Sequence, residues 1–106
     1  MKKILLLFIV LLFQELSSQE IKKDFPLSKE IEETSGLEIV DDLFVTHNDS
    51  GGEASLYYLS RKGKIINKRK IKSATNKDWE DITRDDKYIY VGDFGNNFSN
   101  RKDLKI

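Results

Sequence analysis

Acidic and amide side chains recur at two similar places in this 106-residue sequence. The stretch DDLFVTHNDSGG covers residues 41–52, and DDKYIYVGDFGN covers residues 85–96. Each stretch begins with two aspartates, continues through a short apolar run and ends in Asp-x-Gly. Carboxylate and amide oxygens are the ligands that a hard cation such as calcium takes from proteins. The two endings, at residues 49–51 and 93–95, are therefore the first candidates for chemistry.

The same endings also have a purely structural interpretation. An Asp or Asn at the end of a strand can cap a loop through its own backbone, and a Gly can supply a left-handed turn. The repetition would then mean only that two equivalent strands end in the same turn. Both interpretations stay open at the level of the sequence.

The elements that must position these residues are expected to be β-strands. After residue 18 the apolar residues form short runs between turn formers, which is typical of strands rather than of helices. The first four strands have short connections, as in an up-and-down meander, and the pattern then restarts. The expected strands cover residues 35–40, 43–46, 55–59, 64–71, 79–83, 88–92 and 104–106.

The interval between the two copies is nearly constant. The aspartates that open and close the two stretches lie 44 residues apart, and Leu37 lies 45 residues before Ile82. A four-stranded unit that recurs every 40–50 residues or so is typical of a β-propeller. We therefore predict an all-β fold, a β-propeller fragment with one four-stranded antiparallel blade at residues 33–73 and part of a second blade at residues 74–106. A lead-in segment at residues 19–32 precedes them.

Residues 1–18 have the features of a secretory signal peptide. Lys2 and Lys3 form a basic start, residues 4–13 are all apolar, and residues 16–18 resemble a cleavage site. The apolar run is shorter than the roughly 20 residues that cross a bilayer. A buried N-terminal helix and a membrane anchor are the alternatives. We expect a secreted, periplasmic or cell-surface protein with no membrane span after cleavage.

Composition narrows the function classes. The sequence has no cysteine, which excludes disulfides, thiolate catalysis, Cys-ligated zinc and a lipid anchor on an N-terminal Cys. Without residues 1–18, the chain keeps 16 basic and 17 acidic residues, a formal charge of −1. This balance argues against a nucleic-acid partner. The basic run at residues 62–72 alternates with Ile and is expected to be a solvated strand face.

Two long stretches resemble secreted bacterial β-propeller proteins. ETSGLEIVDDLFVTHNDSGGEASLYYLSRKGKI looks like their opening blade, and DWEDITRDDKYIYVGDFGNNFSNRKDLKI is similar to their second inner strand and loop. Phytase-like esterase propellers, the SdiA-regulated group and, more loosely, NHL-repeat and gluconolactonase-like families have such openings. The resemblance covers residues 31–106.

The resemblance also implies a longer ring. Propellers of these families usually close with six blades or so, and a single blade leaves a sheet face and an edge strand open. We therefore expect the chain to be a piece of a longer product that supplies the remaining blades. The alternatives are a small self-contained β protein and an oligomer that completes the ring between chains.

A metal site follows from the same resemblance. In related propellers, inner strands point their leading ends at the central channel, where carboxylates bind a cation that orients or polarises a phosphate or ester substrate. No spacing here matches an EF-hand loop. The expected metal ligands, with calcium as the expected cation, are Glu33, Glu80, Asp81, Asp49 and Asp93, of which Glu33 and Glu80 come first. The wider set of candidates adds Asp78, Asn48, Asn96 and Asn97.

The remaining chemical side chains have simpler interpretations. His47, the only histidine, could be a general base or a metal ligand, but it has no second His or Cys nearby, so a packed or exposed loop residue is expected. Trp79 is expected to be a core residue between blades, with a stacking platform as the alternative. Ser35 and Ser50 lack a Gly-x-Ser-x-Gly elbow, and the DFG at residues 93–95 lacks the other kinase motifs.

Two functions remain in view. The first is an exported propeller fragment that acts at most as a binding or scaffold module for a small-molecule or surface ligand. The alternative is the N-terminal part of a calcium-dependent propeller hydrolase that acts on phosphate or carboxylic esters. The sequence names no catalytic residue for the second.

Overall fold

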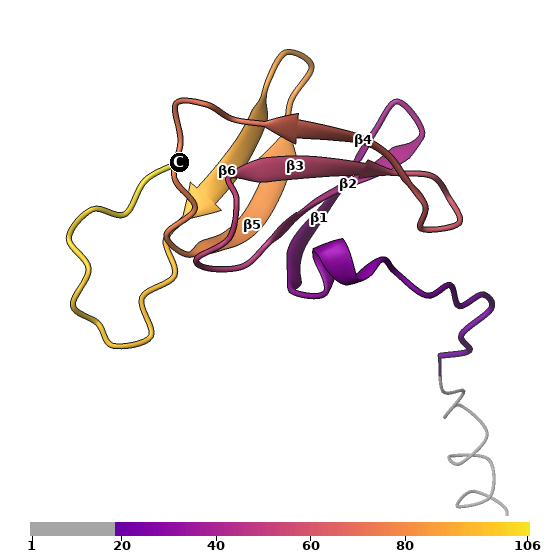
Figure 1. Cartoon of the computed structure of the whole chain (residues 1–106), viewed down its shortest axis with the longest axis horizontal. Coiled ribbons are helices and arrows are strands. Elements are labelled where there is room, and N and C mark those ends of the chain that lie inside the picture. Colours follow the sequence, from indigo (N-terminus) through magenta and orange to yellow (C-terminus); the bar gives the residue numbers. More distant parts are fainter. Residues whose placement is uncertain (1–18) are drawn as a thin grey trace, which may run out of the picture.

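A four-stranded antiparallel sheet comes first along the chain (Figure 1). The computed structural model describes residues 19–106, and the predicted signal peptide at residues 1–18 lies outside the described residues. The sheet is an up-and-down meander, as predicted, with its strands hydrogen-bonded in sequence order. They are β1 (Thr34–Val40), β2 (Leu43–Asn48), β3 (Ser55–Leu59) and β4 (Ile65–Lys70).

A second, two-stranded antiparallel sheet follows, made of β5 (Trp79–Arg84) and β6 (Ile89–Asp93). The strand expected at residues 104–106 is reduced to a single antiparallel bridge between Asp93 and Lys105. A 3-10 turn, η1 (Lys29–Ile31), is the one helical element among residues 19–106. The fold is thus all-β, and none of its described residues belong to a helix long and apolar enough to cross a bilayer.

The hairpins β1–β2 and β5–β6 repeat each other pair by pair. Each cross-strand pair of the second hairpin lies 45 residues after a pair of the first, and the same register shift occurs near the start of β1 and of β5. The matching pairs include Gly36–His47 with Asp81–Gly92, Leu37–Thr46 with Ile82–Val91, and Ile39–Phe44 with Arg84–Ile89. The 44-residue interval read from the aspartates is therefore wrong for the strands. Asp93 is the counterpart of Asn48.

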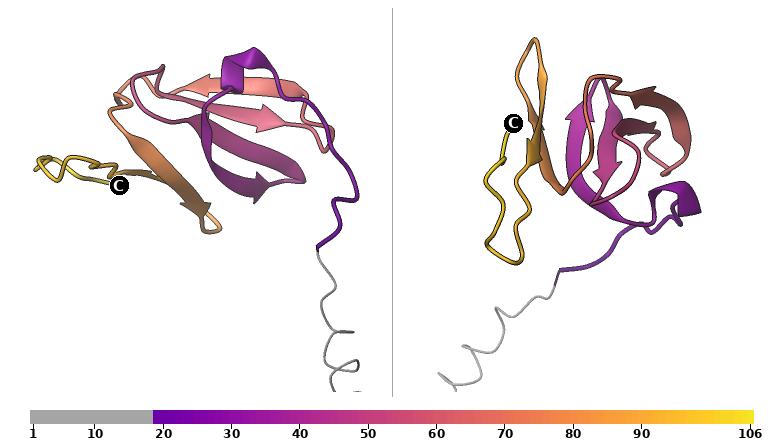
Figure 2. Two further views of the ribbon diagram at one scale, coloured as in Figure 1. Left: turned by 90° about the horizontal axis from the view of Figure 1, so that it is seen from below. Right: turned by 60° about the vertical axis from the view of Figure 1, so that its left-hand side comes forward.

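The second sheet lies beside the first at an angle to it (Figure 2), and the two share one apolar core. β1 packs against β5 across the boundary between the sheets. Val45 and Leu56 from the first sheet meet Trp79 and Ile82 from the second. Trp79 is only 4% exposed, which confirms it as a core residue between the sheets. Burial of these side chains holds the ends of β2 and β5 at a fixed separation.

The other face of the four-stranded sheet has a smaller core. Tyr57 and Leu59 are buried there against Ile31, which belongs to the predicted lead-in segment. Part of that segment is therefore packed onto the sheet rather than free of it. At the far edge, the side chains of β4 are exposed after Ile65, which confirms the basic run as a solvated strand face. Charged side chains on an edge strand also discourage edge-to-edge aggregation.

Candidate metal centre

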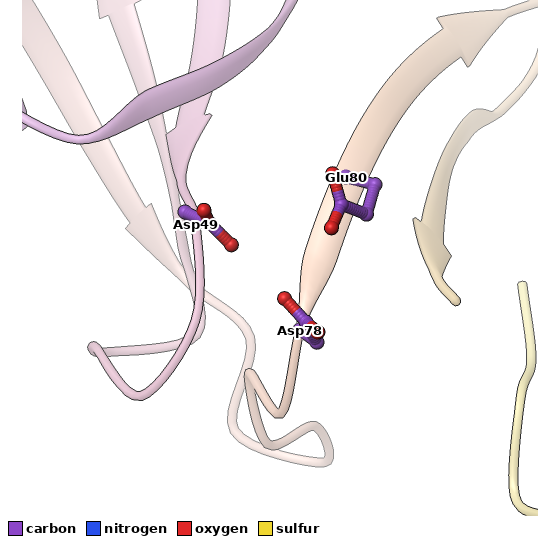
Figure 3. A group of neighbouring side chains, drawn as sticks. All are labelled: Asp49, Asp78 and Glu80. Atoms are coloured by element: carbon purple, nitrogen blue, oxygen red, sulfur yellow. The ribbon is translucent and has the colours of Figure 1, made fainter. Parts of the chain in front are cut away.

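Three carboxylates from the two sheets converge at one corner of the molecule (Figure 3). Asp49 directly follows β2, Asp78 directly precedes β5, and Glu80 lies within β5. Figure 3 shows the side chain of Asp49 facing those of Asp78 and Glu80 across the gap between the sheets. One oxygen from each carboxylate lies within 4.8 Å of the other two, and all three residues are half-buried.

This spacing suits a hard cation. Calcium binds oxygens at roughly 2.3–2.6 Å, so two oxygens on one ion are at most about 5 Å apart. The three oxygens already satisfy that limit. A single calcium ion could thus contact Asp49, Asp78 and Glu80 with little rearrangement, and it would join the two sheets.

The surroundings of Asp78 raise the pKa of its carboxyl group. Burial is the main factor that raises the pKa of Asp78 above its usual range, and the adjacent carboxylate of Asp49 raises that pKa further. Asp93 adds to the increase, whereas the Arg101 guanidinium opposes it. A bound cation would relieve the repulsion between the carboxylates and stabilise the ionised form of Asp78.

One buried oxygen of the carboxylate group lacks a partner. Asp49 Oδ1 is buried and accepts no hydrogen bond from any residue between 19 and 106. Asn48 Oδ1 and Asp93 Oδ2 are also unpaired, but the Asn48 amide donates to Glu30 O and Asp93 is paired with Arg101, so neither belongs to the carboxylate group. Buried polar atoms in folded proteins nearly always have a partner, which can be an ion or a water molecule. The unpaired Asp49 Oδ1 is a second observation, beside the spacing of the carboxylates, that favours a cation here.

A glycine makes room for Asp78. A Cβ atom on Gly95 would lie only 2.1 Å from Asp78 Cγ, so no other residue type fits there without movement. Gly95 also donates its N–H to Asp78 O at 3.1 Å. The left-handed turn predicted for both repeat glycines occurs at Gly51, with φ +73°, and not at Gly95. Glycine is therefore favoured at residue 51 by the positive φ and at residue 95 by the close approach of Asp78.

The five predicted ligands divide into two groups. The structure brings Asp49 and Glu80 together, with Asp78 from the wider set as the third member. Glu33 and Asp81 are exposed and lie outside the group. Glu33 contributes through its backbone, because Glu33 O accepts the N–H of Asp49 at 2.9 Å. The carboxylate of Asp81 accepts the N–H of the next residue at 2.8 Å.

Asp93, the fifth predicted ligand, is engaged in a buried ion pair. It is 3% exposed, and its Oδ1 lies 2.9 Å from Arg101 Nη1. The same oxygen accepts the N–H of Asp78 at 3.1 Å. Arg101 also donates to Gly95 O at 2.9 Å. Asp93 therefore supports the backbone of Asp78 and lies outside the carboxylate group.

His47 is a packed residue, as expected, but it belongs to β2 rather than to a loop. It is fully buried, and its Nδ1–H donates to Asn48 O at 3.0 Å. The edge of its ring meets Trp79, with ring centroids 5.7 Å apart. Its side chain fills the space between the sheets beside Gly36, where a Cβ would lie 2.7 Å from His47 Nε2.

Two residues around the site were missed at the sequence level, Asn76 and Arg101. The Asn76 side chain, 3% exposed, hydrogen-bonds to backbone groups of both sheets. Arg101 pairs with the buried Asp93 from a segment that looks like a polar loop. An Asn or Arg in a polar connection carries no periodic signal that separates it from a solvated turn residue.

Comparison with known proteins gives no match: no family model fits the sequence, and no curated protein and no solved structure is significantly similar to the chain.

Proposed function

We propose that this protein is an exported β-propeller module that binds calcium, or a similar hard divalent cation, between its first two blades. Asp49, Asp78 and Glu80 are the proposed ligands. The observation that carries the proposal is the convergence of these three carboxylates, from two separate sheets, to within 4.8 Å. The unpaired buried Oδ1 of Asp49 supports it.

Several features support the propeller assignment. The first sheet is a four-stranded meander, which is the form of a propeller blade. The second hairpin repeats the first at 45 residues with the same register shift. β1 and β5, which would be the innermost strands, pack against each other. The resemblance of the sequence to secreted bacterial propellers also supports a propeller fold.

The second sheet has room for further strands. A cavity of about 340 Å³ lies beside β6. Its lining is largely apolar and includes Leu56, Ile71, Trp79, Ile89, Val91 and Ile106. Lys105 starts to pair with β6, with Asp93 N donating to Lys105 O at 2.9 Å and Lys105 N donating back at 3.2 Å. A further strand in that register would pair with β6 as the third strand of the second sheet and cover the cavity.

Calcium titration by calorimetry tests the proposed site. We expect the wild-type chain to bind one calcium ion and Glu80→Gln to bind it about 100-fold more weakly or worse, because a direct ligand is lost. Glu33→Gln is the matched control, since Glu33 is exposed and outside the carboxylate group, and its affinity should equal that of the wild type. No binding by the wild type, or unchanged affinity in Glu80→Gln, would refute the proposal.

The same arrangement of carboxylates is also compatible with the hydrolase alternative. Calcium takes about six to eight oxygens, so three carboxylates leave positions for a phosphate or ester oxygen that the ion would polarise. Calcium-dependent release of nitrophenol from a nitrophenyl phosphate or acetate, abolished by Glu80→Gln, would favour the hydrolase. Calcium binding without such turnover would favour the binding module.

A further inference from the structure

Asn76 joins the two halves of the carboxylate group through its side chain. It lies in the connection between β4 and β5 and is 3% exposed. Its Nδ2 group donates to Asn48 O at 2.9 Å and also to Asp49 O. Its Oδ1 accepts the N–H of Trp79 at 3.1 Å. One amide thus connects the end of β2 to the start of β5.

These backbone contacts lie directly beside the proposed ligands. Asp49 O belongs to the same residue as one of the ligand carboxylates. The N–H of Trp79 lies in the chain between the other two ligands, Asp78 and Glu80. Any shift of one side of the Asn76 bridge would change the separation of the three carboxylates.

We propose that Asn76 is the positioning residue that holds Asp49 against Asp78 and Glu80 for cation binding, an inference that rests on the function proposed above. A primary amide offers two N–H donors and one oxygen acceptor on the same planar group. The Asn76 side chain uses its N–H donors and its oxygen acceptor at the same time. Asp has no donor in its ionised form, and Ala has no polar side chain, so neither can bridge the two strands.

The experiment uses europium(III) as a luminescent substitute for calcium in the 106-residue chain. Luminescence lifetimes in H₂O and D₂O count the water molecules on the bound ion. We expect Asn76→Ala to weaken calcium binding about 10- to 100-fold, as other supporting residues of metal sites do. We also expect about one more water molecule on europium, because Asp49 leaves the ion and water replaces its oxygen. Asn67→Ala, which changes an exposed asparagine of β4, should alter neither quantity.

The double variant Asp49→Ala/Asn76→Ala shows whether Asn76 acts through Asp49. If it does, the double variant binds calcium no more weakly than Asp49→Ala alone, because the effects of coupled residues are not additive. Additive losses would overturn the inference, as would an unchanged affinity and water count in a folded Asn76→Ala protein. A merely structural role would lower the melting temperature without changing the water count.

A second variant covers the case in which Asn76→Ala does not fold. Asn76→Asp keeps the side-chain shape and the acceptor for Trp79 N–H but loses the two donor bonds. Its added negative charge should attract a cation, so weaker calcium binding in this variant supports positioning, and equal or stronger binding contradicts it. If the wild type does not bind calcium, the proposed function and this inference fail together. If only Glu80→Gln weakens binding, this inference alone fails.

Discussion

The Asp78 carboxylate lies where its own ionisation is unfavourable. Burial and the neighbouring Asp49 raise its pKa, and Gly95 leaves just enough space for it. Ionisable groups that destabilise a fold in this way are concentrated at functional sites. A cation bound at the proposed site should therefore restore stability that this corner loses in the metal-free protein.

The first prediction follows from the expected effect of the Asp78 charge on stability. Asp78→Asn keeps the side-chain shape and removes the charge, so at neutral pH the metal-free variant should melt at a higher temperature than the wild type. Its calcium affinity should fall by about 100-fold or more, because a ligand is lost. Thermal unfolding with EDTA and with calcium measures both effects. A lower melting temperature in EDTA would contradict the account of Asp78.

The second prediction separates the two repeat glycines. Gly95→Ala forces a methyl group onto the Asp78 carboxylate, so it should destabilise the fold by about 1–3 kcal/mol and also weaken calcium binding. Gly51→Ala meets open space and only strains a positive φ, which costs about 1–2 kcal/mol. Its calcium affinity should stay unchanged. Urea unfolding and calcium titration of both variants test this difference, and equal calcium affinities would contradict it.

Part of the site could be predicted from single residues. The closeness of Asp49 and Glu80 could be predicted because they lie near the ends of strands from the two repeats. Glu33 and Asp81 have the same residue types and similar positions, yet they face solvent. The contribution of Asn76 depends on three backbone groups that are brought together only by the packing of the two sheets.

At the scale of elements, the hairpin β1–β2 shows why the sequence suggested an interval one residue too short. Asp41 and Asp42 form its two-residue turn, both with positive φ. In the second hairpin the turn closes between Asp85 and Tyr88, with Asp85 N donating to Tyr88 O at 3.0 Å. Asp85 therefore corresponds to Val40. Aspartates that look equivalent in the sequence thus occupy different positions in the two turns, and their 44-residue spacing misled. The apolar pair Leu37 and Ile82 gave the correct 45-residue interval between the two hairpins.

The third prediction concerns the link between β4 and the loop before β3. Glu53 lies 2.9 Å from Lys68 Nζ and 3.0 Å from Lys70 Nζ. Mainly through Lys68 and then Lys70, the pKa of Glu53 falls from its usual 4.5 to about 2. A carboxyl whose pKa is lower in the folded state stabilises the fold above its unfolded pKa. That stability is lost as the pH falls from 4.5 toward 2.

Glu53→Gln removes this contribution. The urea midpoint of the variant should therefore fall less steeply than that of the wild type between pH 4.5 and about 2. Glu53 is well exposed, so added salt should shrink the difference between the two proteins. If the urea midpoints of both proteins fall equally with pH at low salt, the stabilising role of the Glu53 ion pairs with Lys68 and Lys70 is contradicted.

At the scale of the whole molecule, one core joins the two sheets. Val45 and Leu56 of the first sheet share it with Trp79 and Ile82 of the second. The alternating apolar runs were sufficient to predict the strands and the meander. The angle and contact between the sheets could not be predicted, because they depend on how Trp79 and His47 fit together in the interior.

The fourth prediction follows from this shared core. Trp79 is the only tryptophan, so its fluorescence reports on the boundary between the sheets. We expect its thermal transition to coincide with the loss of the far-UV circular dichroism signal, since the sheets unfold together. Val45→Ala should reduce the free energy of unfolding by about 1–3 kcal/mol, and it should lower the midpoint temperatures of both transitions equally. A fluorescence change that precedes the loss of strand signal would mean that the sheets separate first.

The most direct measurement is a crystal structure of the 106-residue chain grown with calcium. We predict one ion between the end of β2 and the start of β5, with oxygens of Asp49, Asp78 and Glu80 at roughly 2.3–2.6 Å from it. The two sheets should still share the core of Val45, Leu56, Trp79 and Ile82, with Asn76 bridging them. An ion bound elsewhere, or three carboxylates that turn away from one another in the presence of calcium, would contradict the central claim.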